Sequence, residues 1–172
     1  MQHTIVVLVE DKPGVANRIS SIFRRRGFNI SSLTVSPTEQ PGTSRFTIVM
    51  ESDKRDAYRL KSYLYKLVNV LRVDDLTDKP NVNRDMALVK VGANSNNRTE
   101  IMQMVEVYRA RVVDVANEAL VVEITGTADK IESFIEVLRP YGIIEMAASG
   151  AVALTRGPIP VYAIERGKAN GN

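Results

Sequence analysis

The order of apolar patterns along the chain is the feature that most constrains its fold. Each half starts with a β-branched strand pattern, which is followed by a helical stripe, two strand patterns, a second helical stripe and a last strand. The strands are expected at 4–9, 29–35, 45–51 and 70–76 in the first half, and at 86–91, 112–115, 120–125 and 143–154 in the second. This order is typical of the ferredoxin-like unit, an antiparallel sheet with both helices on one face. The sequence therefore predicts an α+β chain with two ferredoxin-like βαββαβ domains in tandem.

Four amphipathic helices are predicted from apolar residues that recur at helical spacing. Their stripes are Val15, Ile19, Ile22 and Phe23; Ala57, Leu60, Leu64 and Leu67; Ile101, Met104, Val105 and Tyr108; and Ile131, Phe134, Ile135 and Leu138. The first helix is expected to end at Gly27, and the three arginines before it suit the negative end of the helix dipole. These arginines equal the formal net charge of +3, so the charge does not indicate a nucleic-acid-binding surface.

Polar residues separate the two halves. The stretch TDKPNVNR predicts a linker at 79–84, between a first domain at 1–78 and a second domain at 85–157. We expect residues 158–172 to form a tail that is partly disordered, because it ends in Gly, Asn and Lys.

One face of each predicted sheet has no helix to cover it. An apolar sheet face left in water favours association, and another copy of the same unit is the simplest cover. The sequence therefore predicts at least a homodimer.

The composition excludes several classes of protein. The chain has no cysteine, so it has neither disulfides nor thiolate metal sites. The start MQHTIVVLVED lacks the charged region of a signal peptide, and no apolar run approaches the ~20 residues of a membrane span. We therefore expect a cytoplasmic protein without a membrane segment.

No pattern in the chain indicates a catalytic or metal site. His3 is the only histidine and is expected at the surface, and no P-loop or dinucleotide motif occurs. Asp74 and Asp75 are expected to point to opposite faces at a solvated strand end. The central strands offer only Phe46 for stacking on RNA bases, which is too little for an RNA-binding sheet. We predict no catalytic residues, no metal ligands and no nucleic-acid partner.

The turn EDKPG, between the first strand and the first helix, is the candidate binding site. We expect Asp11 to be the N-cap and Pro13 to lie in the first helical turn. Gly14 has no side chain, so a carboxylate can approach the N–H groups of Gly14 and Val15 at the positive end of the helix. Tight packing of strand against helix would explain this glycine equally well.

The stretch VEDKPGVANRISSIFRRRGFNISSLTV resembles the ACT domain, a ligand-sensing module of amino-acid metabolism. Together with KLVNVLRVDDL, MALVKV and GTADKIESFIEVLRPYGIIEMAASGAVALTRG, it resembles the regulatory (small) subunit of acetolactate synthase, also called acetohydroxyacid synthase. The resemblance extends from about Thr4 to Gly157. It implies a non-catalytic chain whose first domain is an ACT domain.

The resemblance also implies a partner and a role. The partner is a separate catalytic (large) subunit with thiamine diphosphate, magnesium and FAD, and this chain itself carries no cofactor. The large subunit condenses two pyruvates, or pyruvate with 2-ketobutyrate, in branched-chain amino-acid biosynthesis. The small subunit stimulates this reaction and confers feedback inhibition by valine or another branched-chain amino acid.

The resemblance places the effector between the ACT domains of two protomers. It implies that Gly14 and Val15 offer N–H groups to the effector's carboxylate, and that Asn29 and Ile30 come from the neighbouring protomer. Many family members have asparagine where this chain has Asp11, whose charge would repel a carboxylate and attract an ammonium group.

The second half has no equivalent of the glycine turn. In GANSNNRTE, Asn97 or Thr99 is expected to cap the helix, and no glycine opens its start. We therefore expect the second domain to be architectural and to contact partners. The alternatives to a regulatory subunit are a free-standing ACT-type amino-acid sensor and a small ferredoxin-like enzyme. The latter would need a polar catalytic cluster that the sequence lacks.

Overall fold

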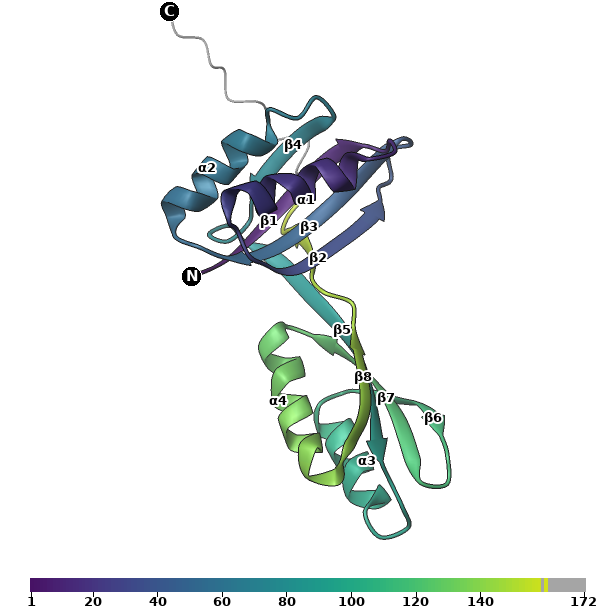
Figure 1. Cartoon of the computed structure of the whole chain (residues 1–172). Helices are drawn as coiled ribbons and strands as arrows, with labels where there is room; N and C mark the ends of the chain where they lie inside the picture. Colours follow the sequence, from purple (N-terminus) through teal and green to yellow (C-terminus); the bar gives the residue numbers. More distant parts are fainter. Residues whose placement is uncertain (159, 161–172) are drawn as a thin grey trace, which may run out of the picture. The chain divides into compact units, whose positions relative to one another are not determined.

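The chain folds as two units, each with its own sheet and core (Figure 1). The computed structural model describes residues 1–158 and 160, so most of the predicted tail lies outside the described residues. The first unit contains Met1–Val82 and the segment from Ala151, and the second contains Asn83–Gly150. This division differs from the predicted limits because the chain returns to the first unit after Gly150.

The first unit is a four-stranded antiparallel sheet with two helices. Its elements are β1 (Gln2–Glu10), α1 (Val15–Arg26), β2 (Ile30–Pro37), β3 (Thr43–Glu51), α2 (Lys54–Leu64) and β4 (Val70–Asp75). The strand order is β2-β3-β1-β4, as in the ferredoxin-like unit. Its main core joins the apolar stripes of both helices to Ile5, Val7 and Val9 of β1 and Phe46, Ile48 and Met50 of β3. Both helices therefore cover the same face of the sheet.

The opposite face of this sheet is not bare. Val6, Leu8 and Leu76 form a small second cluster with Ala153 of β9 (Val152–Thr155). The backbone N–H of Ala151 donates to the Ser32 hydroxyl at 3.0 Å. The expectation that the first sheet leaves this face for another copy is wrong, because the returning segment covers part of it.

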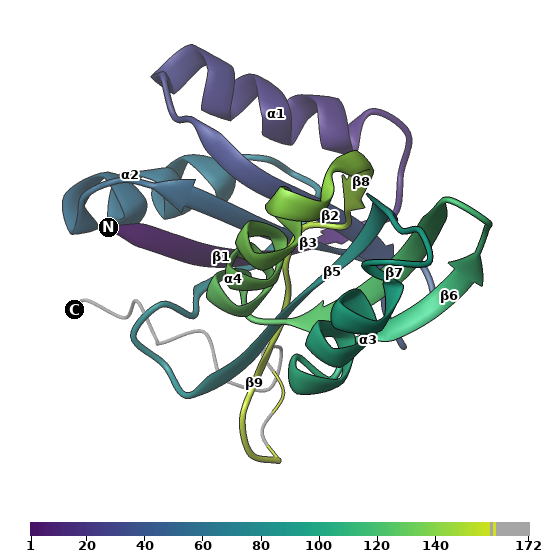
Figure 2. The same cartoon turned by 90° about the horizontal axis from the view of Figure 1, so that it is seen from below.

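The second unit repeats the arrangement. Its elements are β5 (Asn81–Gly92), α3 (Arg98–Val107), β6 (Arg111–Val115), β7 (Ala119–Gly126), α4 (Ala128–Leu138), the short 3-10 helix η1 (Arg139–Tyr141) and β8 (Ile143–Ala148). The strand order is β6-β7-β5-β8, and one core joins α3 and α4 to the same face of the sheet (Figure 2). Because β5 begins at Asn81, residues 81–84 of the predicted linker are strand.

The expected last strand at 143–154 is two strands. The alternating pattern continues through this stretch, but β8 ends at Ala148 and β9 begins at Val152. Gly150 between them has φ of +77°, a left-handed conformation that glycine adopts without strain. The sequence pattern gave no sign of this break, because glycine also occurs inside strands.

Candidate functional site

The turn between β1 and α1 is short and exposed. The N–H of Asp11 donates to the carbonyl of Gly42 at 2.8 Å, and the N–H of Lys12 donates to the carbonyl of Glu10 at 3.0 Å. These bonds hold the chain against the loop that precedes β3. The four residues from Asp11 to Gly14 are all exposed, whereas Val15 is buried in the core.

Gly14, not Asp11, is the N-cap of α1. The helix begins at Val15, Gly14 has φ of +81°, and no side chain caps the helix. The prediction for Asp11 and that for Pro13 in the first helical turn are therefore wrong. Because Gly14 is left-handed and is itself the N-cap, the helix begins at Val15. Asp11 and Pro13 therefore both lie before the helix.

The start of α1 presents unused donors. Its first intrahelical bond runs from Arg18 N–H to the Gly14 carbonyl at 3.1 Å, and the N–H of Val15 reaches the Lys12 carbonyl only at 3.3 Å. Within residues 1–158 and 160, the N–H groups of Gly14, Ala16 and Asn17 have no recorded acceptor. A Cβ built on Gly14 would meet nothing within 4 Å, so the approach is open. Free N–H groups at the positive end of a helix suit a carboxylate.

A polar network lies beside the turn. Glu10 pairs with Lys12 at 2.8 Å and accepts a 2.8 Å hydrogen bond from the Asn69 amide, and Arg18 donates to the Asn69 side-chain oxygen at 2.7 Å. Hydrogen bonds from Lys12 and Asn69 lower the pKa of Glu10 below its ordinary value. Glu10 is thus bound to Lys12 and Asn69.

Sequence reasoning missed this network. Asn69 is a buried polar residue within KLVNVL, an otherwise largely apolar stretch. A buried side-chain amide needs hydrogen-bond partners, which is the signal that was available in the sequence.

Asn29 and Ile30 lie at the other end of α1. Asn29 is exposed just after Gly27, the C-cap, and Ile30 is the first residue of β2 and packs beside the core. The twelve residues of α1 span about 18 Å at 1.5 Å per residue. One copy of the chain therefore does not bring Asn29 and Ile30 to the turn at Gly14.

The edge strand β2 has an uncovered apolar side. Leu33 and Val35 pair with the core residues Ile48 and Phe46 of β3, so they point to the helix face of the sheet. Nevertheless they are 38% and 48% exposed. The edge next to α1 thus offers both apolar side chains and an unpaired strand edge.

The turn after β5 is closed by its own side chains. Asn97 precedes α3 but makes no side-chain cap, and Asn94 instead accepts from the N–H groups of Asn96 and Asn97 at 2.9 and 3.3 Å. Asn97 therefore occupies the predicted N-cap position of α3, but its side chain makes no capping hydrogen bond to the helix. The Asn97 side chain accepts from the N–H of Asn94 at 2.8 Å, so the two asparagines bond reciprocally.

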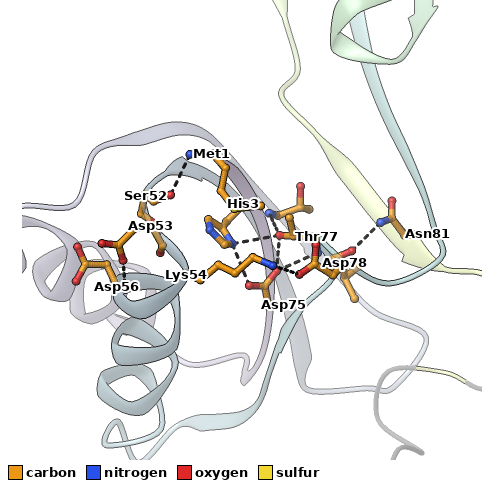
Figure 3. Close-up of polar contacts among 12 residues, drawn as sticks. Met1, His3, Ser52, Asp53, Lys54, Asp56, Asp75, Thr77, Asp78 and Asn81 are labelled. Atoms are coloured by element: carbon orange, nitrogen blue, oxygen red, sulfur yellow. Dashed lines mark hydrogen bonds and ion pairs between the residues drawn. The ribbon is translucent and has the colours of Figure 1, made fainter.

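His3 is buried, contrary to expectation. It is 2% exposed, and its Nδ1 lies 3.1 Å from Asp75 Oδ2 and 3.3 Å from the Thr77 hydroxyl (Figure 3). Asp74 is also buried, at 3% exposure, and pairs with Arg72 at 2.5 Å and Lys79 at 3.1 Å. The expectation of a solvated strand end is wrong for Asp74, because Arg72 on the same strand and Lys79 just after it enclose the carboxylate, whereas the Asp75 side chain is 37% exposed.

Metal and membrane features are absent from the part of the chain that the structure describes. There, no three His, Asp or Glu side chains come together as a possible metal site. In the same residues, no helix has the length and apolar character that a membrane crossing requires.

Comparisons with known proteins identify one family. Residues 84–157 match the model for the small subunit of acetolactate synthase, and residues 5–72 match the model for the ACT domain of such small subunits. The acetolactate synthase small subunit of Mycolicibacterium smegmatis is 48% identical over 156 residues, which cover 91% of this chain and 92% of that protein. The chain belongs to the acetolactate synthase small-subunit family.

Two further relatives of the acetolactate synthase small-subunit family support this assignment. The probable small subunit of Archaeoglobus fulgidus is 45% identical over 157 residues, covering 91% of this chain and 98% of that protein. The crystal structure of the small subunit from Thermotoga maritima matches with a TM-score of 0.85 at 38% identity, covering 92% of this chain and 99% of that chain. The predicted fold of two ferredoxin-like units with a first ACT domain is confirmed.

Membership of the acetolactate synthase small-subunit family gives the general role. A small subunit implies a large catalytic partner, and an ACT domain fits regulation better than catalysis. The chain is therefore a regulatory subunit. The residues predicted to bind an effector lie within the ACT match at 5–72.

Proposed function

We propose that this chain stimulates the catalytic subunit of acetolactate synthase and makes it sensitive to feedback by a branched-chain amino acid, with valine as the first candidate. The observation that carries the proposal is the uncapped start of α1, where Gly14 leaves free N–H groups open to solvent. The catalytic chemistry, with thiamine diphosphate, magnesium and FAD, belongs to the large subunit. The setting is cytoplasmic branched-chain amino-acid biosynthesis.

The effector's carboxylate binds the N–H groups of Gly14 and Val15. The helix dipole adds a favourable interaction with the negative charge. Val15 already has a long bond to the Lys12 carbonyl at 3.3 Å, which a ligand carboxylate can replace. Asp11 is exposed beside this site and acts on both charges of the amino acid. In a site that is partly exposed to water, the repulsion of the carboxylate and the attraction of the ammonium group together change the binding free energy by about 1 kcal/mol in either direction.

The complete site needs two copies of the chain. Because β2 is an edge strand, two copies can pair their β2 strands antiparallel across a twofold axis. This pairing would cover Leu33 and Val35 and set the two α1 helices antiparallel. The start of one α1 then lies near the end of the other, so that Asn29 and Ile30 of the second copy complete the site.

Regulation follows from linkage. An effector that binds residues of both copies stabilises one arrangement of the dimer over others. If the catalytic subunit's activity depends on that arrangement, effector binding changes the activity without touching the reacting atoms. Asn29 contributes polar contacts and Ile30 an apolar wall.

Reconstitution with the candidate large subunit tests the proposal. Acetolactate formation is measured with and without this chain, and then with valine, leucine or isoleucine. We expect the chain to raise the rate and at least one amino acid to lower it. If neither effect occurs, the proposed function is wrong.

Gly14→Asp tests the site itself. The new carboxylate fills the approach space and repels the effector's carboxylate, so stimulation should persist while inhibition is lost. Gly142→Asp is the matched control, because Gly142 also has a positive φ of +87° and open space around its missing Cβ. If the Gly14→Asp variant keeps full inhibition, the site lies elsewhere.

A further inference from the structure

A cavity of about 470 Å³ lies on the face of the first sheet that the helices do not cover. One wall is the loop between β2 and β3, and another is formed by Leu154 and Thr155 of β9 with Gly157 and Pro158. Leu8, Pro37, Leu154 and Pro158 supply apolar lining. Its volume falls within the range of ordinary small-molecule sites. None of the residues around Gly14 lines it, so it is separate from the candidate effector site.

Arg45 places a positive charge in this cavity. It lies opposite Leu8 in the pairing of β1 with β3 and therefore points to the same face of the sheet. Its Nη2 donates to the carbonyl of Ala153, and its Nε is buried without a hydrogen-bond partner among the described residues. A guanidinium has five N–H donors, so this contact leaves donors for a ligand.

The charge on Arg45 is not neutralised by a direct ion pair in the described part of the chain. Burial lowers the pKa of its guanidinium, whereas the carboxylates of Glu39 and Asp74 raise it. Asp74 pairs with Arg72 and Lys79, and Glu39 is exposed. Since arginine stays protonated in proteins, the cavity keeps a positive group that is partly withdrawn from water.

The β2–β3 loop is held in shape by its own hydrogen bonds. Thr38 N–H donates to the Thr43 carbonyl at 3.0 Å, and the Thr43 N–H donates to the Gln40 carbonyl at 3.2 Å. The Thr38 hydroxyl accepts from the N–H of Gln40 at 3.1 Å. A preformed wall lowers the entropy that a ligand must overcome on binding.

We propose that this cavity is a second ligand site, which takes a small organic acid with an apolar tail. The carboxylate binds the Arg45 guanidinium, and the tail lies against Leu8, Pro37, Leu154 and Pro158. The proposal stands on the cavity alone and does not depend on the effector site at Gly14.

The first test compares two probes on the unaltered chain. Isocaproate is a branched carboxylate, and isocaproamide has the same shape without the charge. We expect isocaproate to shift the ¹H–¹⁵N signals of Thr38, Gln40 and Thr43 in a saturable way. Isocaproamide should bind about tenfold more weakly or worse, because charge-assisted hydrogen bonds to arginine are lost. Equal affinities for the two probes, or no shifts in this loop, would overturn the proposal.

The second test uses variants. Arg45→Met should weaken isocaproate binding by about tenfold or more, whereas Arg55→Met, on the exposed side of α2, should leave it unchanged. Thermal unfolding checks that Arg45→Met still folds. Glu39→Gln carries little risk to folding and should strengthen binding by about twofold to threefold, because an exposed repulsive charge is removed.

The two sites can fail independently. Gly14→Asp should not change the loop shifts caused by isocaproate. If isocaproate moves only the signals of Gly14 and Val15, the cavity is not a carboxylate site, whatever valine does to the reconstituted enzyme. If the chain neither raises the rate nor makes it sensitive to valine, leucine or isoleucine, but isocaproate binds the loop, the second site stands and the proposed function fails.

Discussion

The two units share one order of elements and differ at the turn after their first strand. In the first unit Gly14 caps α1 in a left-handed conformation, and free N–H groups face open space. In the second, the turn before α3 is braced by Asn94, whose side chain accepts from the N–H groups of Asn96 and Asn97 and whose carbonyl accepts from the Arg98 N–H at 3.0 Å. Arg98 adds bonds from Nη2 to the carbonyls of Ala93, Ala116 and Asn117 at 3.2, 2.7 and 2.8 Å.

This difference shows that the fold alone does not make a ligand site. The same strand-to-helix turn is open to a ligand in the first unit, as the proposed function requires, and is filled by its own side chains in the second. We therefore expect effector binding from the first turn and structural stability from the second. The predictions below test that division of roles.

The largest expected effect is complementation between two inactive variants. Gly14→Asp and Asn29→His should each abolish feedback inhibition when the variant is the sole small subunit. A dimer with one copy of each variant has one site that contains both changes and one site that contains neither. We expect mixtures of the two to regain a substantial part of the inhibition by valine in the reconstituted enzyme.

The control for complementation is a double variant. A copy that carries both substitutions, mixed with Gly14→Asp, cannot form an intact site and should stay insensitive. If the mixed single variants also stay insensitive although mass spectrometry shows mixed dimers, Asn29 does not complete the site of the other copy.

Arg98→Met should weaken the second turn. Its guanidinium supports three carbonyl groups, and hydrogen bonds to a charged group contribute about 1.5 to 3 kcal/mol. We expect the free energy of unfolding of the second unit to fall by about 2 kcal/mol, measured by native-state hydrogen exchange of β7 amides. Arg98→Lys should recover part of this loss. An unchanged protection pattern would show that the brace is dispensable, and feedback inhibition should persist in either variant.

Much of the fold could be predicted from sequence because it depends on local periodicity. The stripe of Val15, Ile19 and Phe23 predicts the buried face of α1, and the continuous apolar runs of β1 and β3 predict strands that are buried on both faces. The features that were mispredicted depend on distant partners or on backbone conformation. His3 is buried because Asp75 and Thr77, over seventy residues away, supply its partners.

The site was predictable only in part, for the same reason. Gly14 can be recognised as an open position, but its left-handed φ, which displaced Asp11 from the N-cap, is not visible in the sequence. The Glu10–Asn69–Arg18 network joins residues whose proximity depends on the pairing of β1 with β4. Asn29 was assigned to the site by family resemblance alone. Its position in one copy gives no sign of this role, because α1 separates it from Gly14.

Lowering the pH should reduce the stability that Asp74 gives the first unit and increase the stability of the second unit through Asp85. Burial raises the pKa of Asp74, but hydrogen bonds from Arg72 and Lys79 outweigh it and leave the pKa below the ordinary value. Asp74 therefore contributes stability that is present above about pH 3.9, the pKa of an unfolded aspartate, and is lost as the pH falls through its lower folded value. In the second unit burial raises the pKa of Asp85, so that unit gains stability as the pH falls through that raised value.

Hydrogen exchange below about pH 4 distinguishes the units. We expect β1 amides to lose protection before β7 amides, and Asp74→Asn to reduce the acid dependence of β1 while lowering its stability at neutral pH. If β7 amides lose protection first, the Asp74 ion pairs do not determine the pH at which the first unit loses stability.

The smallest expected effect distinguishes two reasons for a glycine at position 14, which are its left-handed backbone conformation and the open approach for a ligand. Alanine at φ of +81° costs about 1 kcal/mol in backbone strain, but its methyl group meets nothing within 4 Å and adds no charge. Gly14→Ala should therefore lower the free energy of unfolding of the first unit by about 1 kcal/mol in a denaturant titration. It should also weaken inhibition by valine far less than Gly14→Asp does. If alanine abolishes inhibition as completely as aspartate, the backbone conformation of Gly14 matters more to the effector than the open approach. If alanine changes neither quantity, the turn adapts and its left-handed conformation is not required.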